Sequence, residues 1–102
     1  MGEYMTIGPA TVGEGDVAGF DIEGAKIGVA RVGGSLYAFS AVCTHQGCPL
    51  VEMGELDGKE LECECHGSVF DVTTGAVLDG PATVPLEVYP TREVDGNVEI
   101  EV

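Results

Sequence analysis

The chain has few large aromatic side chains with which to fill an interior. Its 102 residues include no Trp, three Phe and three Tyr. Val, Ile, Leu and Ala must therefore provide most of the packing, and a chain of this length has room for one domain with one modest core. We expect a single domain over residues 1–102.

Positive charge is also scarce, and this excludes whole classes of partner. Four Lys and Arg face eighteen Asp and Glu, for a formal net charge of −14. Such a surface repels phosphate backbones and anionic lipid headgroups, so we expect no nucleic-acid or membrane partner. The same charge complements a basic docking face on a partner protein, because opposite fields speed encounter. Solubility alone, as in a salty cytoplasm, is an alternative explanation of the charge.

Long hydrophobic runs and targeting signals are absent as well. No stretch approaches the ~18 apolar residues of a membrane-spanning helix. The N-terminus also lacks a basic segment followed by an apolar one, the mark of a secretory leader. We therefore expect a protein without a membrane segment, located in the cytoplasm.

What the sequence does contain is a series of short strand patterns separated by turn signals. Strands are expected over residues 16–22, 26–32, 35–39 and 97–102, with turns at Gly33-Gly34, Asp57-Gly58 and Asp95-Gly96. No window keeps a 3.6-residue period over three turns, so long helices are not expected. Sixteen glycines and five prolines also favour an all-β fold of many short strands.

All four cysteines and both histidines lie in two short segments. Residues 43–48 read Cys-Thr-His-Gln-Gly-Cys, and residues 63–68 read Cys-Glu-Cys-His-Gly-Ser. Each segment follows a strand-like run, is expected to be a loop, and offers one Cys–His pair: Cys43 with His45, and Cys63 with His66. Two thiolates and two imidazoles are the ligands of a histidine-ligated [2Fe–2S] centre. The same ligand set also serves tetrahedral zinc.

From Val29 to about Tyr89 the sequence resembles the Rieske iron–sulfur family. The residues that carry the resemblance are the two loops, Arg31-Val32-Gly33-Gly34-Ser35-Leu36-Tyr37-Ala38, the motif Ser68-x-Phe70-Asp71, and Gly80-Pro81-Ala82. The resemblance implies a Rieske-like fold of three antiparallel sheets, with a cluster-binding subdomain over about residues 41–83 at one tip. It also implies a [2Fe–2S] cofactor, with Cys43 and Cys63 on one iron and His45 and His66 on the other.

The resemblance assigns further residues to the surroundings of the cluster. Gly47 and Gly67 are expected to let the backbone approach closely and to aim N–H groups at the sulfurs. Ser68 is expected to donate a hydrogen bond to a bridging sulfide. Pro81 belongs to a loop that covers the cluster from a third side.

Cys48 and Cys65 are left over once the ligands are assigned. Members of the respiratory cytochrome bc type have cysteines at these positions, joined by a disulfide that ties the two loops together, whereas ferredoxins of bacterial oxygenases generally lack both. Cytosolic disulfides are rare, so two buried thiols are the alternative. The placement of one cysteine in each loop favours the disulfide.

Other positions depart from the respiratory pattern. Gln46 stands where quinol-oxidising members have a leucine, and Glu64 where they usually have proline. Phe70 replaces a tyrosine whose hydroxyl donates to a cysteine sulfur, while Ser68 is retained. With one of two hydrogen-bond donors kept, we expect a reduction potential between those of oxygenase-type and quinol-oxidising members.

These features predict a soluble, monomeric one-electron carrier, not an enzyme, that passes electrons between a reductase and an oxygenase or another redox enzyme. Two alternatives remain: a Rieske-type small subunit of a larger reductase such as nitrite reductase, and a redox sensor. Acidic residues crowd the segment between the loops and form either a docking face or a solvated strand. They are Glu52, Glu55, Asp57, Glu60, Glu62 and Glu64.

Overall fold

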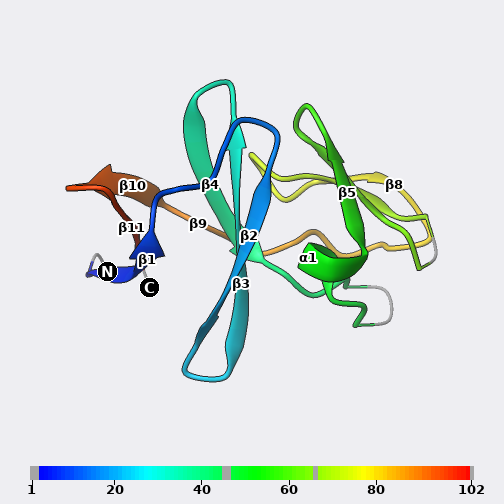
Figure 1. Ribbon diagram of the computed structural model, residues 1–102. Helices are drawn as coiled ribbons and strands as arrows, with labels where there is room; N and C mark the ends of the chain where they lie inside the picture. Colours follow the sequence, from blue (N-terminus) through cyan, green and yellow to red (C-terminus); the bar gives the residue numbers. More distant parts are fainter. Residues whose placement is uncertain (1–2, 45–46, 66, 102) are drawn as a thin grey trace.

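The computed structural model describes residues 3–44, 47–65 and 67–101, and in them the chain forms three antiparallel sheets (Figure 1). The first sheet has the order β1-β11-β10, from β1 (Tyr4–Pro9), β11 (Asn97–Glu101) and β10 (Thr91–Val94). The second has the order β2-β3-β4-β9, from β2 (Val17–Ile22), β3 (Ala25–Val32), β4 (Ser35–Ser40) and β9 (Val88–Tyr89). The third has the order β5-β6-β7-β8, from β5 (Gly54–Asp57), β6 (Glu60–Cys63), β7 (Val69–Asp71) and β8 (Val77–Asp79). The predicted all-β fold of three sheets is confirmed.

Helix is limited to one short element in the described part of the chain. The helix α1 (Leu50–Met53) begins after Pro49, and the N–H of Leu50 donates to the carbonyl of Ala41. This bond fixes α1 to the chain that leaves β4. No helix of the described residues is long and apolar enough to cross a membrane.

Glycine-containing turns set the registers of the hairpins. Gly33 and Gly34, between β3 and β4, have φ values of 60° and 85°, and Asp95 and Gly96, between β10 and β11, have 52° and 79°. Two positive φ values in a two-residue turn match the twist of the flanking strands. Both turns lie where the sequence predicts them.

The turn between β5 and β6 lies one residue later than predicted. Asp57 is still the last residue of β5 and faces Glu60 across the hairpin, so the turn residues are Gly58 and Lys59. Gly58 has φ of 62°. The prediction of Asp57-Gly58 as the turn residues is therefore wrong by one position, because Asp57 still pairs with Glu60 as part of the β5–β6 ladder.

The buried side chains form two hydrophobic clusters. One lies between the first two sheets and contains Val29, Val98 and Ile100, all fully buried. The other lies toward the third sheet and contains Phe39, Leu50, Leu61, Phe70 and both Cys43 and Cys63. In Figure 1 the third sheet and α1 occupy one end of the molecule, and the chain termini lie at the opposite end. The second hydrophobic cluster therefore supports the end that carries the cysteine loops.

Candidate functional site

The two cysteine-containing loops repeat one pattern of backbone hydrogen bonds. The N–H of Cys43 donates to the carbonyl of Cys48 over 2.8 Å, and the N–H of Cys63 donates to that of Ser68 over 2.7 Å. The N–H of Gly47 returns to the carbonyl of Cys43, and that of Gly67 to the carbonyl of Cys63, each over 2.8 Å. The two loops are therefore equivalent turns, and Cys43 and Cys63 hold equivalent positions in them.

Both glycines are needed for the form of these turns. Gly47 has φ of 74° and Gly67 has φ of 84°, in the left-handed region that residues with a side chain rarely adopt. Their N–H groups donate to carbonyl oxygens and so close the turns. The sequence had led us to expect these N–H groups to donate to sulfur atoms.

The four cysteines divide into two kinds. Cys48 and Cys65 form a disulfide that joins the two loops, with a Cα–Cα distance of 6.7 Å, as the resemblance implied. Cys43 and Cys63 stand outside that disulfide and are buried, with 1% and 0% of their surface exposed. One buried cysteine per loop, held in one hydrophobic cluster, suits a pair of soft thiolate ligands for iron.

Three residues of the predicted site fall outside this description. His45, Gln46 and His66 lie outside the described residues. The structure thus places the two predicted cysteine ligands in one hydrophobic cluster and joins the other two cysteines in a disulfide.

A third segment, residues 80–84, contacts both loops. The backbone N–H of Ala82 donates to the hydroxyl oxygen of Ser68 over 3.0 Å, and Ser68 is fully buried. The Thr44 hydroxyl donates to the carbonyl of Val84 over 2.5 Å, and the peptide bond between Gly80 and Pro81 is cis. Because Ser68 accepts from Ala82, its own hydroxyl proton stays available for donation.

Phe70 and Asp71 on β7 have contrasting roles beneath the second loop. Phe70 is fully buried among the core residues and has no hydroxyl to offer. The Asp71 carboxylate accepts from the Thr73 N–H at 2.9 Å and from the Thr73 hydroxyl at 2.6 Å, and Lys59 lies 3.4 Å away. Burial acts to raise the pKa of Asp71, but the Thr73 hydrogen bonds and the Lys59 ammonium outweigh it, so the pKa lies below the usual 3.8. Sequence reasoning included Asp71 only as part of a motif, and this role was missed.

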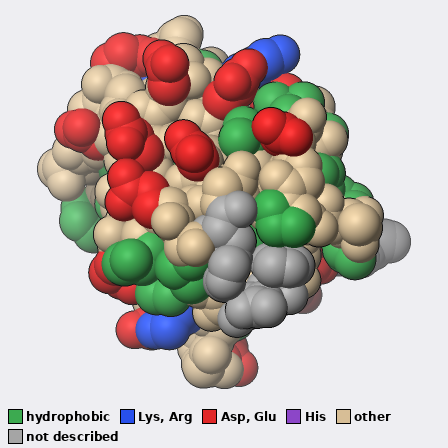
Figure 2. Space-filling model, turned by 90° about the vertical axis from the view of Figure 1, so that its right-hand side faces the viewer, with side chains coloured by type: hydrophobic (Ala, Val, Ile, Leu, Met, Phe, Trp, Pro, Cys, Tyr) green, Lys and Arg blue, Asp and Glu red, His purple; other side chains and the backbone are tan. Residues whose placement is uncertain are grey.

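The hairpin between the two loops carries an acidic face. Glu55 lies opposite Glu62 in the ladder, and Asp57 lies opposite Glu60, with all four side chains exposed. Figure 2 views the molecule from the side of the third sheet and shows acidic side chains gathered in its upper part, with hydrophobic ones below them. Like charges directly opposite each other destabilise a sheet. This face therefore reduces the stability of the hairpin.

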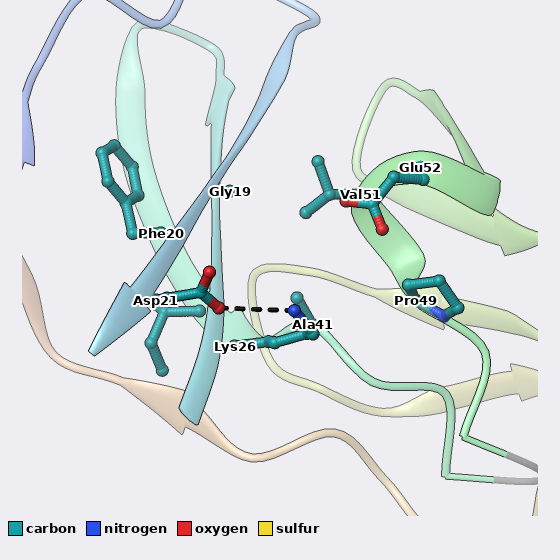
Figure 3. Close-up of a pocket in the computed structure, with 9 residues that line it drawn as sticks. Gly19, Phe20, Asp21, Lys26, Ala41, Pro49, Val51 and Glu52 are labelled. Atoms are coloured by element: carbon teal, nitrogen blue, oxygen red, sulfur yellow. Dashed lines mark hydrogen bonds and ion pairs between the residues drawn. The ribbon is translucent and has the colours of Figure 1, made fainter. Parts of the chain in front are cut away.

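A shallow hollow of about 200 Å³ separates β2 from α1 (Figure 3). Its apolar side is formed by Ala41, Pro49 and Val51, and its edge carries an exposed ion pair between Lys26 and Asp21, 3.4 Å apart. Val51 packs close to Gly19, where an added Cβ would lie 3.2 Å from a Val51 methyl. The charges of this ion pair are exposed to solvent, which weakens them, so we assign the hollow to packing and not to chemistry.

Comparisons with known proteins agree with this site. The family model of the Rieske [2Fe-2S] domain matches residues 2–90. The ferredoxin component of the naphthalene 1,2-dioxygenase system of Pseudomonas putida is 40% identical over 79 residues, which cover 78% of this chain and 75% of that protein.

Solved structures give the same answer. A ferredoxin of Sphingomonas yanoikuyae B1 superposes with a TM-score of 0.90 at 29% identity, over 98% of this chain and 99% of that one. A chain in the complex of reduced oxygenase and oxidised ferredoxin of carbazole 1,9a-dioxygenase superposes with a TM-score of 0.85 at 35% identity, over 94% and 99% of the two chains. The chain thus belongs to the Rieske [2Fe–2S] family and is a Rieske-type ferredoxin, an electron carrier and not a catalytic enzyme.

Proposed function

We propose that Cys43, His45, Cys63 and His66 hold the [2Fe–2S] cluster, the two cysteines on one iron and the two histidines on the other. The observation that carries this assignment is the pair of buried cysteines at equivalent positions of two equivalent loops, both outside the disulfide. When bound, the cluster accepts and releases a single electron, and its two neutral imidazoles make reduction easier than in an all-thiolate cluster.

The remaining residues of the site hold the ligands in place. The turns closed by Gly47 and Gly67 orient the two cysteines, and the disulfide prevents the loops from separating. Ser68 accepts a hydrogen bond from the N–H of Ala82 and donates its own hydroxyl proton toward the cluster. Pro81 belongs to segment 80–84, which covers the cluster. We infer that residues 1–102 form one Rieske domain whose cluster-binding subdomain spans about residues 41–83.

The partner chemistry follows from the surface around the loops. Exposed apolar side chains adjoin each loop. Met53 is 40% exposed and its carbonyl accepts from the N–H of Glu64, while Val84 is 56% exposed and its carbonyl accepts from Thr44. The acidic face of the hairpin lies on the same subdomain. Exposed apolar side chains beside the loops, together with the carboxylate-rich hairpin, are complementary to a partner face that has hydrophobic and basic parts.

We infer that this chain works as a soluble monomer in the cytoplasm, between a reductase and an oxygenase that carry such basic faces. The chain resembles a ferredoxin that was solved in complex with its oxygenase, which supports that class of acceptor. The acidic face supports it independently, because side-by-side carboxylates lower the stability of the hairpin and so need a reason beyond folding.

The ligand assignment is tested by pulsed EPR on the reduced protein labelled with ¹⁵N only in histidine. Two strongly coupled ¹⁵N nuclei are expected, because each of His45 and His66 binds iron through one ring nitrogen. Substitutions Cys43→Ala and Cys63→Ala should each remove the visible and EPR spectra of the cluster. The matched pair Cys48→Ala/Cys65→Ala should retain both spectra. Coupling to one nucleus or none would overturn the assignment.

The docking face is tested by electron transfer to the oxygenase of carbazole 1,9a-dioxygenase in stopped flow at low and high salt. The pair Glu55→Gln/Glu62→Gln should slow the second-order rate at low salt and flatten its salt dependence, since steering acts through charge. The control pair Glu23→Gln/Asp95→Asn removes the same charge from exposed turns outside the third sheet. Equal slowing by the two pairs would mean that net charge matters and the hairpin face does not.

A further inference from the structure

Three sulfur atoms meet where the two loops are joined. The Sγ atoms of Cys48, Cys63 and Cys65 all lie within 4.8 Å of one another. Two of them form the disulfide, and the third belongs to a residue assigned above to iron. Cys43 is not part of this group of three. The sulfur of Cys63, a proposed iron ligand, thus lies beside a disulfide. When the protein holds no cluster, this sulfur is not bound to iron.

Sulfur atoms this close can exchange partners without any added reagent. Thiol–disulfide exchange requires a thiolate to reach a disulfide sulfur and passes through one bond formed and one bond broken. Cys63 is fully buried, so thiols in solution are shielded from it. An attack from within the molecule needs no access from solvent and benefits from the fixed proximity of the reacting atoms.

We propose that Cys63 exchanges into the disulfide when the protein holds no cluster. Its Sγ bonds to Sγ of Cys48, the bond between Cys48 and Cys65 breaks, and Cys65 leaves with the electron pair and takes up a proton. The proton of the Cys63 thiol passes to water. One disulfide and two thiols are present before and after, so neither oxidant nor reductant is consumed.

Cys48 is the sulfur attacked because of what each product does to the loops. A bond from Cys63 to Cys65 would link residues separated only by Glu64, within one loop, and would leave the two loops unconnected. A bond from Cys63 to Cys48 again links the first loop to the second. It therefore keeps the loop-to-loop constraint that the original disulfide imposes on the chain.

The exchanged chain cannot receive a cluster at the proposed ligands, because Cys63 is then in a disulfide. After the cluster is lost, the exchanged disulfide keeps the protein in the cluster-free form. A cellular thiol reductant must reduce this disulfide before a cluster can be assembled again. This consequence rests on the proposed role of Cys63, whereas the exchange itself does not. A map of thiols and disulfides therefore tests the inference independently of electron transfer.

Two matched variants give the decisive comparison. Cys43→Ala and Cys63→Ala each lose one proposed ligand, but only Cys63→Ala loses the attacking sulfur. Each is incubated without oxygen, its thiols are trapped with N-ethylmaleimide, and it is cleaved at acidic pH with a glutamyl endopeptidase. Cleavage after Glu64 separates positions 63 and 65 for mass spectrometry. In Cys43→Ala the trapped thiol should move from Cys63 to Cys65 over time, and in Cys63→Ala the original disulfide should persist.

A second measurement starts from wild-type protein that is loaded and folded. After the cluster is removed with a chelator, the thiol at Cys65 should appear at a rate independent of protein concentration. The yield of cluster reconstitution should fall in step and recover after treatment with a phosphine reductant. The inference is overturned if Cys65 stays in its disulfide in both experiments. It is equally overturned if Cys43 enters disulfides to a similar extent, because this marks scrambling in an unfolded chain.

Discussion

Removing the disulfide should speed loss of the cluster by a large and calculable factor. The perturbation is the pair Cys48→Ala/Cys65→Ala, which leaves all proposed ligands in place. The disulfide spans a sequence separation of 17, and closing a loop of this size stabilises a folded protein by about 3 kcal/mol. Since 1.4 kcal/mol is a factor of ten, opening of the loops becomes more frequent by about 10².

The other contacts between the two cysteine loops are too weak to replace the disulfide between Cys48 and Cys65. The two loops share contacts with segment 80–84 through one hydrogen bond each, from Thr44 to Val84 and from Ala82 to Ser68. A net hydrogen bond contributes about 1 kcal/mol, less than the disulfide. Without the covalent link, the loops are joined through these contacts, the hairpin between them and the packing of the buried cysteines beneath them.

The assay is bleaching of the visible absorbance of the loaded protein at a fixed temperature with an iron chelator. The variant should bleach up to ~10² times faster than wild type. Wild-type protein whose disulfide has been reduced chemically should bleach like the variant, which separates the covalent link from the lost side-chain atoms. Bleaching rates within a factor of about two of wild type would refute the reasoning, since they would show that loop opening does not limit cluster loss.

Three further substitutions test the surroundings of the cluster. Phe70→Tyr should raise the midpoint potential in film voltammetry by roughly 40 mV, because a new hydroxyl donor worth about 1 kcal/mol favours the reduced state; an unchanged or lower midpoint would remove this position from the cluster's environment. Ser68→Ala should lower the midpoint by a similar amount, and an unchanged value would show that its hydroxyl serves the fold alone. Asp71→Asn should lower the unfolding free energy by about 1–2 kcal/mol at neutral pH in urea titrations, because hydrogen bonds to a charged carboxylate are the stronger ones. The folded pKa of Asp71 is depressed, so its stabilisation is present above the usual 3.8 and is lost as pH falls through the folded value; the gap between wild type and variant should therefore narrow in acid, and a gap that is constant with pH would contradict the assignment to Thr73 and Lys59.

Several turns, strands and loops of this protein could be predicted from the sequence, because short-range conformational preferences determine them. The paired glycines at 33–34 and the Asp95-Gly96 turn lie where positive φ values are needed, and the strand expected over residues 97–102 forms as β11 (Asn97–Glu101). The loop cysteines were identifiable from their spacing, and the disulfide followed from the family resemblance.

What escaped prediction depends on contacts between distant segments. The turn after β5 lies at Gly58 and Lys59 because the ladder retains Asp57, and β2 joins β3 through Glu23, a non-glycine residue with φ of 51°. The carboxylate of Asp71 meets Lys59 only after two strands have paired. Opposition of Glu55 and Glu62 likewise requires the hairpin register, which composition alone does not give.

The position of the first sheet has a practical consequence for attaching this protein to an electrode or to another enzyme. Tyr4 and Glu101 face each other in the ladder between β1 and β11, so both ends of the described chain lie side by side. Figure 1 places them at the end of the molecule away from the third sheet and α1. A linker attached at either terminus, to an electrode or to a fused redox enzyme, would therefore leave the cysteine loops facing outward. One anchoring chemistry at either end should give films of uniform orientation.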